Sequence, residues 1–187
     1  MEEGRSLTLS LTDQQEFISR CKDDPAYFWK WTLGSETVYD KQLEMATAIR
    51  DHSRVAVVGA NGTGKDWQAA RIMLWWQSVH HPAITVVLGP THRQVSDIVW
   101  KEARSAFLSP RIPLDGQMYR TARWELDDRH YAVGFATDNE FNIQGFHSPH
   151  LLVIITEAHN VEQSHIDAVK RLNPARMLLT GNAFANS

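Results

Sequence analysis

A glycine-rich segment between an apolar run and a helical pattern constrains this chain most strongly. Residues 59–66 read Gly-Ala-Asn-Gly-Thr-Gly-Lys-Asp, and they directly follow the apolar run 55–58. The spacing is that of a phosphate-binding P-loop, G-x-x-x-x-G-K, although Asp66 stands where Ser or Thr is usual. Residues 66–76 then have helical character. Because a P-loop connects a strand to a helix, the segment predicts both a phosphate ligand and an α/β fold.

The residue types in this loop suit the binding of a nucleoside triphosphate. Glycine adopts backbone angles that are closed to residues with a Cβ, and the helix N-terminus adds a partial positive charge. Lys65 would add a full charge next to the β- and γ-phosphates, so we count it as a catalytic residue as well. The predicted nucleotide-binding loop consists of Gly59, Ala60, Asn61, Gly62, Thr63, Gly64, Lys65 and Asp66.

A second apolar run, residues 151–155, is followed by Thr156 and Glu157. The run lacks polar alternation, which is typical of a parallel strand covered on both faces. A P-loop ATPase needs a group that orients the attacking water, and a carboxylate at a strand end can polarise that water. We therefore predict that Glu157 is catalytic; the alternative is a solvated glutamate at a strand end.

Asp66 and Thr156 look like an exchange of two metal-binding groups. The usual P-loop hydroxyl binds Mg²⁺ and hydrogen-bonds an acidic residue at the end of the later strand. Here the carboxylate is on the loop and the hydroxyl is on the strand, and Mg²⁺ accepts hard oxygen ligands from either side. We predict that Asp66 binds Mg²⁺ and that Thr156, the second metal-site residue, donates a hydrogen bond to Asp66. The alternative is a degenerate, inactive site.

With both halves of the site in place, the chain resembles the ATPase domain of the large terminase subunit of tailed bacteriophages, the motor that packages DNA. The resemblance spans residues 24–183, and the order of its elements carries it more than the P-loop alone. Besides the P-loop and the acidic strand, the similar stretches are 24–29, 39–44, 86–95, 144–148 and 178–182.

The resemblance implies that Gln42 contacts adenine and that Asn182, after an apolar strand, senses the γ-phosphate. It also implies ATP and Mg²⁺ as cofactors, and translocation of viral double-stranded DNA into a procapsid together with a portal protein and a small terminase subunit. The active form would be a homo-oligomeric ring in the cytoplasm of the infected host cell. A neighbouring subunit would supply an arginine finger, for which the candidates are Arg93, Arg104, Arg111, Arg120 and Arg123.

The amino-acid composition excludes some classes of protein. The net charge of −3 argues against a self-sufficient DNA-binding domain, although a ring could still offer a few basic residues to a pore. The single cysteine predicts an intracellular protein without an intrachain disulfide, and no apolar run approaches the ~20 residues of a membrane span. We divide the chain into a helical lead-in at 1–50 and a P-loop ATPase core at 51–187, with no acidic nuclease domain visible.

Strand and helix signals alternate along the core, which predicts a mainly parallel sheet with helices on both faces, as in P-loop NTPases of the RecA-like type. The ligand would lie at the carboxyl ends of the strands, beside Gly59, Glu157 and Gly181. The predicted helices are 11–23, 38–51, 64–79, 92–107 and 161–171. The predicted strands are 54–58, 84–88, 121–126 (an edge strand), 132–136, 151–155 and 176–180.

Two other functions remain open at this point. A helicase-type DNA-dependent ATPase fragment is one, because the run Glu157-Ala158-His159 occurs in similar form in such proteins. A nucleotide-binding assembly module with an inactive site is the other. Trp29 and Trp31 could line an adenine pocket, although a core role is the alternative. The nine histidines show no zinc-ligand spacing with cysteine, so we expect them to be solvated or capping residues.

Overall fold

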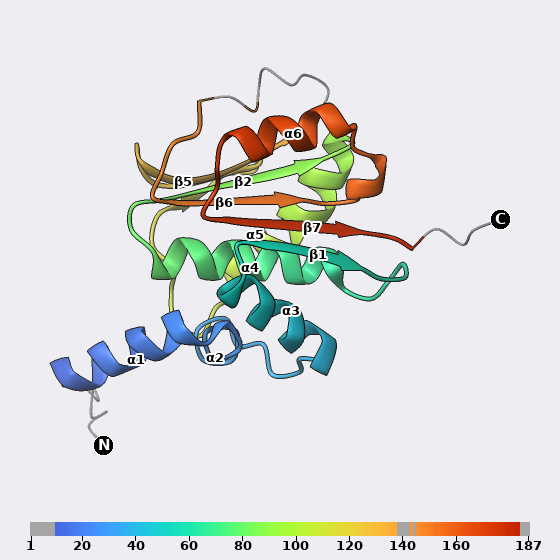
Figure 1. The fold of residues 1–187 in the computed structure, drawn as a ribbon. Helices are drawn as coiled ribbons and strands as arrows, with labels where there is room; N and C mark the ends of the chain where they lie inside the picture. Colours follow the sequence, from blue (N-terminus) through green and yellow to red (C-terminus); the bar gives the residue numbers. More distant parts are fainter. Residues whose placement is uncertain (1–9, 138–142, 144, 184–187) are drawn as a thin grey trace.

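The computed structural model describes residues 10–137, 143 and 145–183. Three helices come first in the chain, and a core of strands and helices follows (Figure 1). The elements are α1 (Leu11–Asp23), α2 (Pro25–Trp31), α3 (Asp40–Asp51), β1 (Arg54–Val58), α4 (Lys65–Val79), β2 (Ala83–Gly89), η1 (Gln94–Val99), α5 (Trp100–Leu108), β3 (Gln117–Met118), β4 (Arg123–Asp127), β5 (His130–Ala136), β6 (His150–Ile155), η3 (Ala158–Asn160), α6 (Gln163–Arg171) and β7 (Arg176–Gly181).

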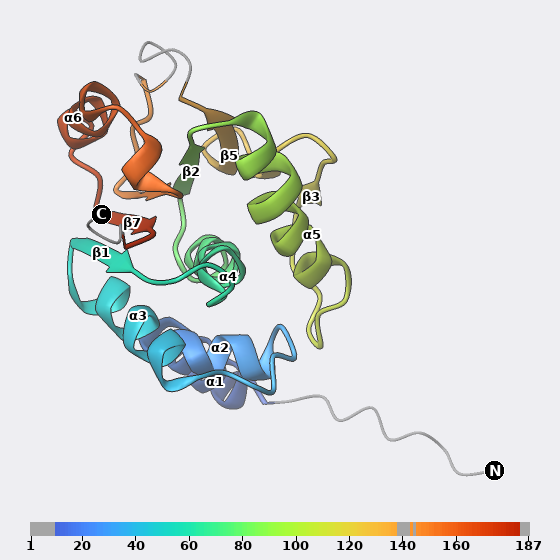
Figure 2. The same cartoon turned by 90° about the vertical axis from the view of Figure 1, so that its right-hand side faces the viewer.

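The strands form one sheet in the order β1-β7-β6-β2-β5-β4-β3. The first five strands in this order run parallel, and β4 and β3 pair antiparallel at the far edge. Helix α6 covers one face of the sheet, and α3 and α4 cover the other (Figures 1 and 2). The predicted α/β fold, a mainly parallel sheet with helices on both faces, is confirmed.

Helix α4 forms the centre of the larger hydrophobic core. It lies between the sheet and the layer formed by α1, α2 and α3 (Figure 2), so its apolar residues are buried around most of its circumference. The lead-in helices are joined to it by indole hydrogen bonds: Trp75 Nε1 donates to the Cys21 carbonyl at 2.8 Å, and Trp29 Nε1 donates to the Arg71 carbonyl at 3.2 Å. A hydrogen bond from a buried indole satisfies its only donor, so these contacts fix the lead-in against the core.

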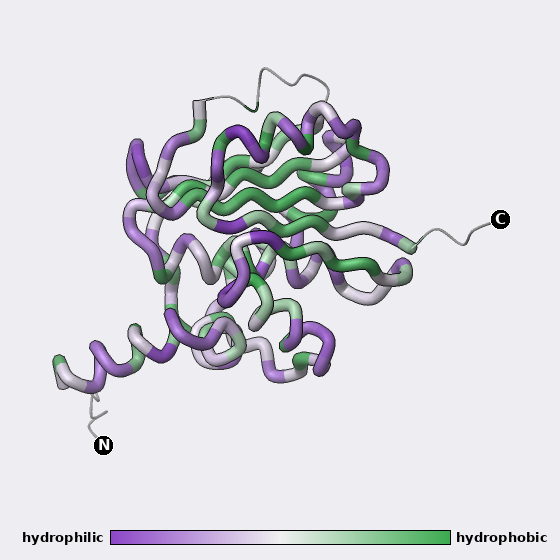
Figure 3. Tube along the Cα trace, in the orientation of Figure 1, coloured by the Kyte–Doolittle hydropathy of each residue, from purple (hydrophilic) through white to green (hydrophobic). Residues whose placement is uncertain are grey.

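Strand β6, predicted to be covered on both faces, lies in the middle of the sheet beside β2. Strand β2 is buried along its whole length, and β6 is buried from its second residue onward. Figure 3 shows the corresponding continuous hydrophobic stretches through the centre of the sheet. By contrast, β1 is an edge strand whose residues alternate between exposed and half-buried.

Two predictions about the elements are wrong. The strand predicted at the edge, residues 121–126, is β4, and the short strand β3 pairs with its outer side through Met118 and Trp124. A two-residue strand carries too little pattern to be recognised in a sequence. The helix predicted over 92–107 is regular only in α5, because residues 94–99 form the wider π-helix η1. Such segments often occur at functional sites.

Two expectations from composition can also be compared with the structure. Within the described ranges, no helix is long and apolar enough to cross a bilayer. Cys21 is a buried free thiol on α1. Burial raises the pKa of this thiol, so the reactive thiolate is disfavoured.

Candidate functional site

The predicted site residues follow the carboxyl ends of three adjacent strands. Strand β7 lies between β1 and β6, and β1 pairs with β7 so that Val58 is opposite Gly181. The first P-loop residue continues this pairing, because the Gly59 amide donates to the Gly181 carbonyl at 3.1 Å. The sheet order therefore brings the P-loop, Asn182 and Glu157 together at the carboxyl ends of the strands.

The P-loop turns into α4 at Gly64. This residue has φ +79° and lies beside Gln42, whose Nε2 would be 3.0 Å from a Cβ at this position. The left-handed conformation and the close approach both require glycine. Thr63 fixes the middle of the loop by donating from Oγ1 to the Ala60 carbonyl at 2.9 Å. Asn61 and Gly62 form its exposed turn.

Lys65 is the first residue of α4, and only 8% of its surface is exposed. Its ammonium group donates to the carbonyls of Gly59 at 3.1 Å and Ala60 at 2.7 Å, and to Asn182 Oδ1 at 3.0 Å. These three acceptors hold the ammonium group directly beside the loop that would surround a phosphate.

Asn182 connects the lysine to the predicted catalytic acid. Its Oδ1 accepts from Lys65, and its Nδ2 donates to Glu157 Oε2 at 3.2 Å. The amide thus spans the gap between the P-loop and the end of β6, which are separated in the sheet by β7. Lys65 and Glu157 converge on the same side of the molecule, although they are far apart in the chain.

Glu157 has a backbone conformation that is uncommon for a residue with a side chain. Its φ and ψ are +49° and +42°, in the left-handed region, where it begins the short helix η3. Such a conformation costs about 1–3 kcal/mol and persists only when the surroundings determine it. It directs the chain away from β6 immediately after the acid.

His159 also belongs to this site, although the sequence analysis assigned it no role. Its Nε2 lies 3.3 Å from Glu157 Oε2, and its Nδ1 accepts from the Asn182 backbone amide at 3.3 Å. His159 lies close to β7, because a Cβ on Gly181 would be 3.2 Å from His159 Nδ1. The available signal was its position two residues after the acid, on the turn that leaves the strand.

Asp66 lies in the first turn of α4, where a negative charge is favoured by the helix N-terminus. Its Oδ1 accepts a hydrogen bond from Gln94 Nε2 at 3.1 Å, at the start of the π-helix η1. The hydroxyl of Thr156, which is fully buried, donates instead to the Leu88 carbonyl at 3.3 Å. The predicted hydrogen bond from Thr156 to Asp66 is therefore not formed, because Thr156 bonds the neighbouring strand and Gln94 takes its place beside Asp66.

The charges around Asp66 indicate a place for a cation. Burial raises the pKa of the Asp66 carboxyl, and the nearby negative charge of Glu157 raises it further, whereas Lys65 lowers it. Two carboxylates near each other repel, and a divalent cation relieves that repulsion. The oxygen donors present therefore fit Mg²⁺, which prefers carboxylates, hydroxyls and water.

A pocket of about 510 Å³ adjoins the P-loop on the side of α3. Its wall includes Gln42, Thr63 and Lys65, together with residues 55–58 of β1. Gln42 is held there by its Oε1, which accepts from the Tyr39 amide at 3.1 Å, and by its carbonyl, which accepts from Gln68. The volume lies in the range of pockets that bind small molecules.

The two tryptophans proposed for an adenine pocket lie away from the pocket beside the P-loop. Trp29 is completely buried in the core against Trp67, and neither Trp29 nor Trp31 lines the pocket beside the P-loop. Of the arginine-finger candidates, Arg111 pairs with Glu36 and Arg123 pairs with Glu125. Gln144, in the stretch 144–148 that carried part of the resemblance, lies outside the described residues.

Comparisons with known proteins give a result for shape but none for sequence. No protein-family model matches the sequence, and no curated protein is similar to it. The fold is similar to the large terminase ATPase domain of Thermus phage P74-26, with a TM-score of 0.57 and 18% identity over 85% of this chain and 69% of that one. It is also similar to the large terminase of bacteriophage HK97, with a TM-score of 0.62 and 15% identity over 89% of this chain and 38% of that one.

A third similar structure is a large terminase from a thermophilic bacteriophage, solved in complex with ADP. It has a TM-score of 0.59 and 14% identity over 79% of this chain and 39% of that one. The chain thus spans less than half of either complete large terminase. At such identities the likeness is one of fold: this chain has the P-loop NTPase fold found in the ATPase domains of phage large terminases.

Proposed function

We propose that this chain hydrolyses ATP with Mg²⁺, and that it does so as the ATPase domain of a motor that packages viral double-stranded DNA. The observation that carries the proposal is the amide of Asn182, which links the ammonium group of Lys65 to the carboxylate of Glu157. A phosphate-binding cation and a water-activating base on either side of one sensing amide are the parts that a P-loop ATPase needs.

The residues of the site would divide the chemistry among them. The backbone from Gly59 to Gly64 and the N-terminus of α4 would bind the phosphates, and Lys65 would exchange its loop carbonyls for phosphate oxygens. Glu157 would accept a hydrogen bond from the attacking water and remove its proton. His159, at 3.3 Å from the same carboxylate, would orient it.

Asp66 and Thr156 are the residues that would hold Mg²⁺. The bound metal would neutralise charge on the β- and γ-phosphates. Asp66 is the stronger candidate, because its carboxylate lies near Glu157 and a cation would relieve their repulsion. The Thr156 hydroxyl donates to Leu88 and keeps lone pairs that can accept or coordinate. Gln94 would position Asp66 through its amide.

Asn182 would report the state of the nucleotide to the rest of the motor. Its two hydrogen bonds depend on where Lys65 and Glu157 lie, so it would respond when the γ-phosphate leaves. Gln42 would contact the adenine from the pocket beside the P-loop. The DNA, a portal protein, a small terminase subunit and a homo-oligomeric ring in the infected cell complete the proposal; the similarity of fold to large terminases supports them.

The proposal is tested with the unmodified chain, Lys65→Ala and the control Lys170→Ala on the exposed side of α6. Binding of a fluorescent ATP analogue and release of phosphate are measured with and without MgCl₂. Since hydrogen bonds to charged groups contribute about 1.5–3 kcal/mol, we expect Lys65→Ala to weaken nucleotide binding by roughly 10- to 100-fold. Lys170→Ala should leave binding unchanged.

Equal binding by Lys65→Ala and the unmodified chain would contradict the assignment of the P-loop. Tight binding without phosphate release at any protein concentration would instead support a nucleotide-binding assembly module. For a ring motor, the turnover per chain should rise with protein concentration, because the arginine finger comes from a neighbouring subunit.

A further inference from the structure

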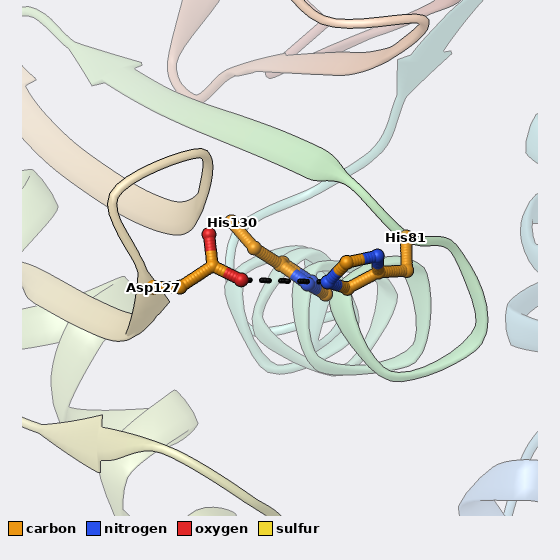
Figure 4. A group of neighbouring side chains, drawn as sticks. All are labelled: His81, Asp127 and His130. Atoms are coloured by element: carbon orange, nitrogen blue, oxygen red, sulfur yellow. Dashed lines mark hydrogen bonds and ion pairs between the residues drawn. The ribbon is translucent and has the colours of Figure 1, made fainter.

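Three potential metal ligands lie close together at the amino ends of the strands, on the side of the sheet away from the P-loop. His81 lies in the connection between α4 and β2, Asp127 ends β4, and His130 begins β5. Strands β2 and β5 are parallel neighbours, so both histidines lie at their amino ends. Figure 4 shows the three side chains directed toward one another from these separate segments. None of them takes part in the proposed nucleotide chemistry.

The distances suit a small metal ion. One ligand atom from each side chain lies within 4.8 Å of the other two, and His81 Nε2 is 3.4 Å from Asp127 Oδ2. Metal–ligand bonds of about 2.0–2.2 Å place tetrahedral ligand atoms roughly 3.3–3.6 Å apart. The His81 and Asp127 side chains are 69% and 51% exposed, so each can move the small distance that closes the site.

The surroundings of His130 leave one of its ring nitrogens with a lone pair that can bind a metal ion. Only 2% of its surface is exposed, and its Nε2 lies 2.9 Å from the carbonyl of Gln77. A carbonyl can only accept, so Nε2 carries the hydrogen, and in the neutral ring Nδ1 carries a lone pair. Metal-binding histidines typically donate their other N–H to such a carbonyl.

The second ring nitrogen of His130 has no hydrogen-bond partner among the residues that the structure describes. A buried polar atom without a partner is unfavourable, and most such atoms in native proteins are satisfied. The nearby ring of His81, with its centroid 4.8 Å away, and the carboxylate of Asp127 supply the other groups that a metal ion would need. A bound cation would give this nitrogen its missing partner.

We propose that His81, Asp127 and His130 bind a transition-metal ion of the Zn²⁺ class. Imidazole ligands suit Zn²⁺ and its neighbours in the periodic table, whereas Mg²⁺ prefers oxygen ligands. Three protein ligands leave a coordination position for water. The ion joins the turn between β4 and β5 to the connection before β2, and so stabilises the amino edge of the sheet.

The experiment titrates metal-free protein with ZnCl₂ in a calorimeter and repeats the titration with MgCl₂. The variants are His81→Ala and Asp127→Asn, both at exposed positions where substitution leaves the core intact. His52→Ala, an exposed histidine at the end of α3, is the matched control. Far-ultraviolet circular dichroism of each metal-free variant verifies that it is folded.

The expected result is one Zn²⁺ per chain at this site, with no comparable binding of Mg²⁺. Removing a direct ligand should weaken Zn²⁺ binding at least about tenfold, the lower end of what the loss of a supporting residue costs. His52→Ala should bind like the unmodified chain. X-ray absorption of the zinc complex should show two imidazole ligands.

Unchanged affinity in both His81→Ala and Asp127→Asn would overturn the proposal. Loss of zinc binding in His159→Ala alone would also overturn it, because the ion would then sit beside Glu157 at the nucleotide site. The zinc titration needs neither ATP nor hydrolysis, so its outcome is independent of the proposed ATPase activity.

Discussion

The parallel strands of the central sheet end on one side, which we call the carboxyl edge, and begin on the other, which we call the amino edge. Each side carries a polar cluster, and the two clusters are built in different ways. At the carboxyl edge, Lys65, Asn182 and Glu157 follow three adjacent strands and are joined by hydrogen bonds. At the amino edge, His81 and Asp127 are exposed, and the buried His130 keeps a nitrogen without a partner among the described residues. One cluster satisfies itself through a bridging amide, and the other is complete only with a ligand.

This difference shows that two candidate sites in one protein can be recognised by different features. The carboxyl edge stores strain in the left-handed backbone of Glu157 and repulsion in the charge near Asp66. At the amino edge, the signal of the cluster is the buried ring nitrogen of His130, which has no hydrogen-bond partner among the described residues. We expect substitutions at the two edges to differ in the size and in the kind of their effects.

The largest effect should come from Glu157→Gln at the carboxyl edge. The amide keeps the shape of the side chain but cannot take a proton from water, so hydrolysis should fall by roughly 10²- to 10⁴-fold. Nucleotide binding should remain within a few-fold of the unmodified chain. Phosphate release and equilibrium binding are measured side by side, with the exposed Glu162→Gln as control; hydrolysis that survives in Glu157→Gln would remove this residue from the mechanism.

Asn182→Ala should have the next largest effect. The substitution removes the bridge between Lys65 and Glu157, and hydrogen bonds to charged groups contribute about 1.5–3 kcal/mol. We expect turnover to fall by roughly 10- to 100-fold, with a smaller change in nucleotide affinity. Removing an amide from exposed α6, in Gln163→Ala, should change neither quantity. A loss of affinity with an unchanged kcat would assign Asn182 to binding alone.

Asp66→Asn should lower the stimulation of hydrolysis by MgCl₂ while making the folded chain more stable at pH 7. The raised pKa means that the folded chain holds the Asp66 proton more tightly than the unfolded chain does. Stability from this group is therefore present at low pH and is lost as the pH rises through the raised pKa. The gain in Tm of Asp66→Asn over the unmodified chain should shrink below the ordinary aspartate pKa of about 3.9.

Thermal unfolding of both chains across this pH range measures the effect. A Tm difference that stays constant from pH 3 to pH 7 would show that Asp66 does not carry the raised pKa. Substituting Asp97, an exposed aspartate in η1, by Asn provides the control, because it leaves the interior of the site unchanged.

The smallest effect should appear at the amino edge without metal. His81 and Asp127 are exposed and separated by 3.4 Å, and such surface pairs contribute less than about 1 kcal/mol. His81→Ala should therefore leave the Tm of metal-free protein nearly unchanged. With ZnCl₂ present, only the chain that retains the three ligands should gain stability. A large loss of Tm without metal would show that the pair is structural instead.

Much of the fold could be predicted because its signals are local. The local sequence alone predicts the conformation of several segments, namely the apolar strands β2, β6 and β7 and the glycine-rich turn before α4. The errors lie where the local pattern is weak: β4 is not an edge strand because the two-residue strand β3 covers it, and residues 94–99 form the π-helix η1 within a stretch whose apolar pattern is helical. A two-residue strand and a change of helix type leave almost no trace in hydrophobic periodicity.

The site could be predicted in part for the same reason. Motif spacing predicted that Lys65 and Glu157 belong to one site, and both contact Asn182. His159 and Gln94 entered only because folding brought them against Glu157 and Asp66. The expected bond between Thr156 and Asp66 failed because the hydroxyl found the carbonyl of Leu88 on the neighbouring strand. Hydrogen-bond partners depend on register and sheet order, which motifs do not specify.

By itself, the sequence determined the glycine-rich turn between a strand and a helix, the acidic strand end and the α/β fold class, since each follows from residue type and spacing along a continuous stretch. The tertiary structure alone decided that β7 lies between β1 and β6, which makes Asn182 the link between lysine and acid. It also brought His81, in the connection between α4 and β2, against Asp127 and His130 on the two sides of the β4–β5 turn. The physical reason is that side-chain contacts between distant segments arise only when the sheet is assembled.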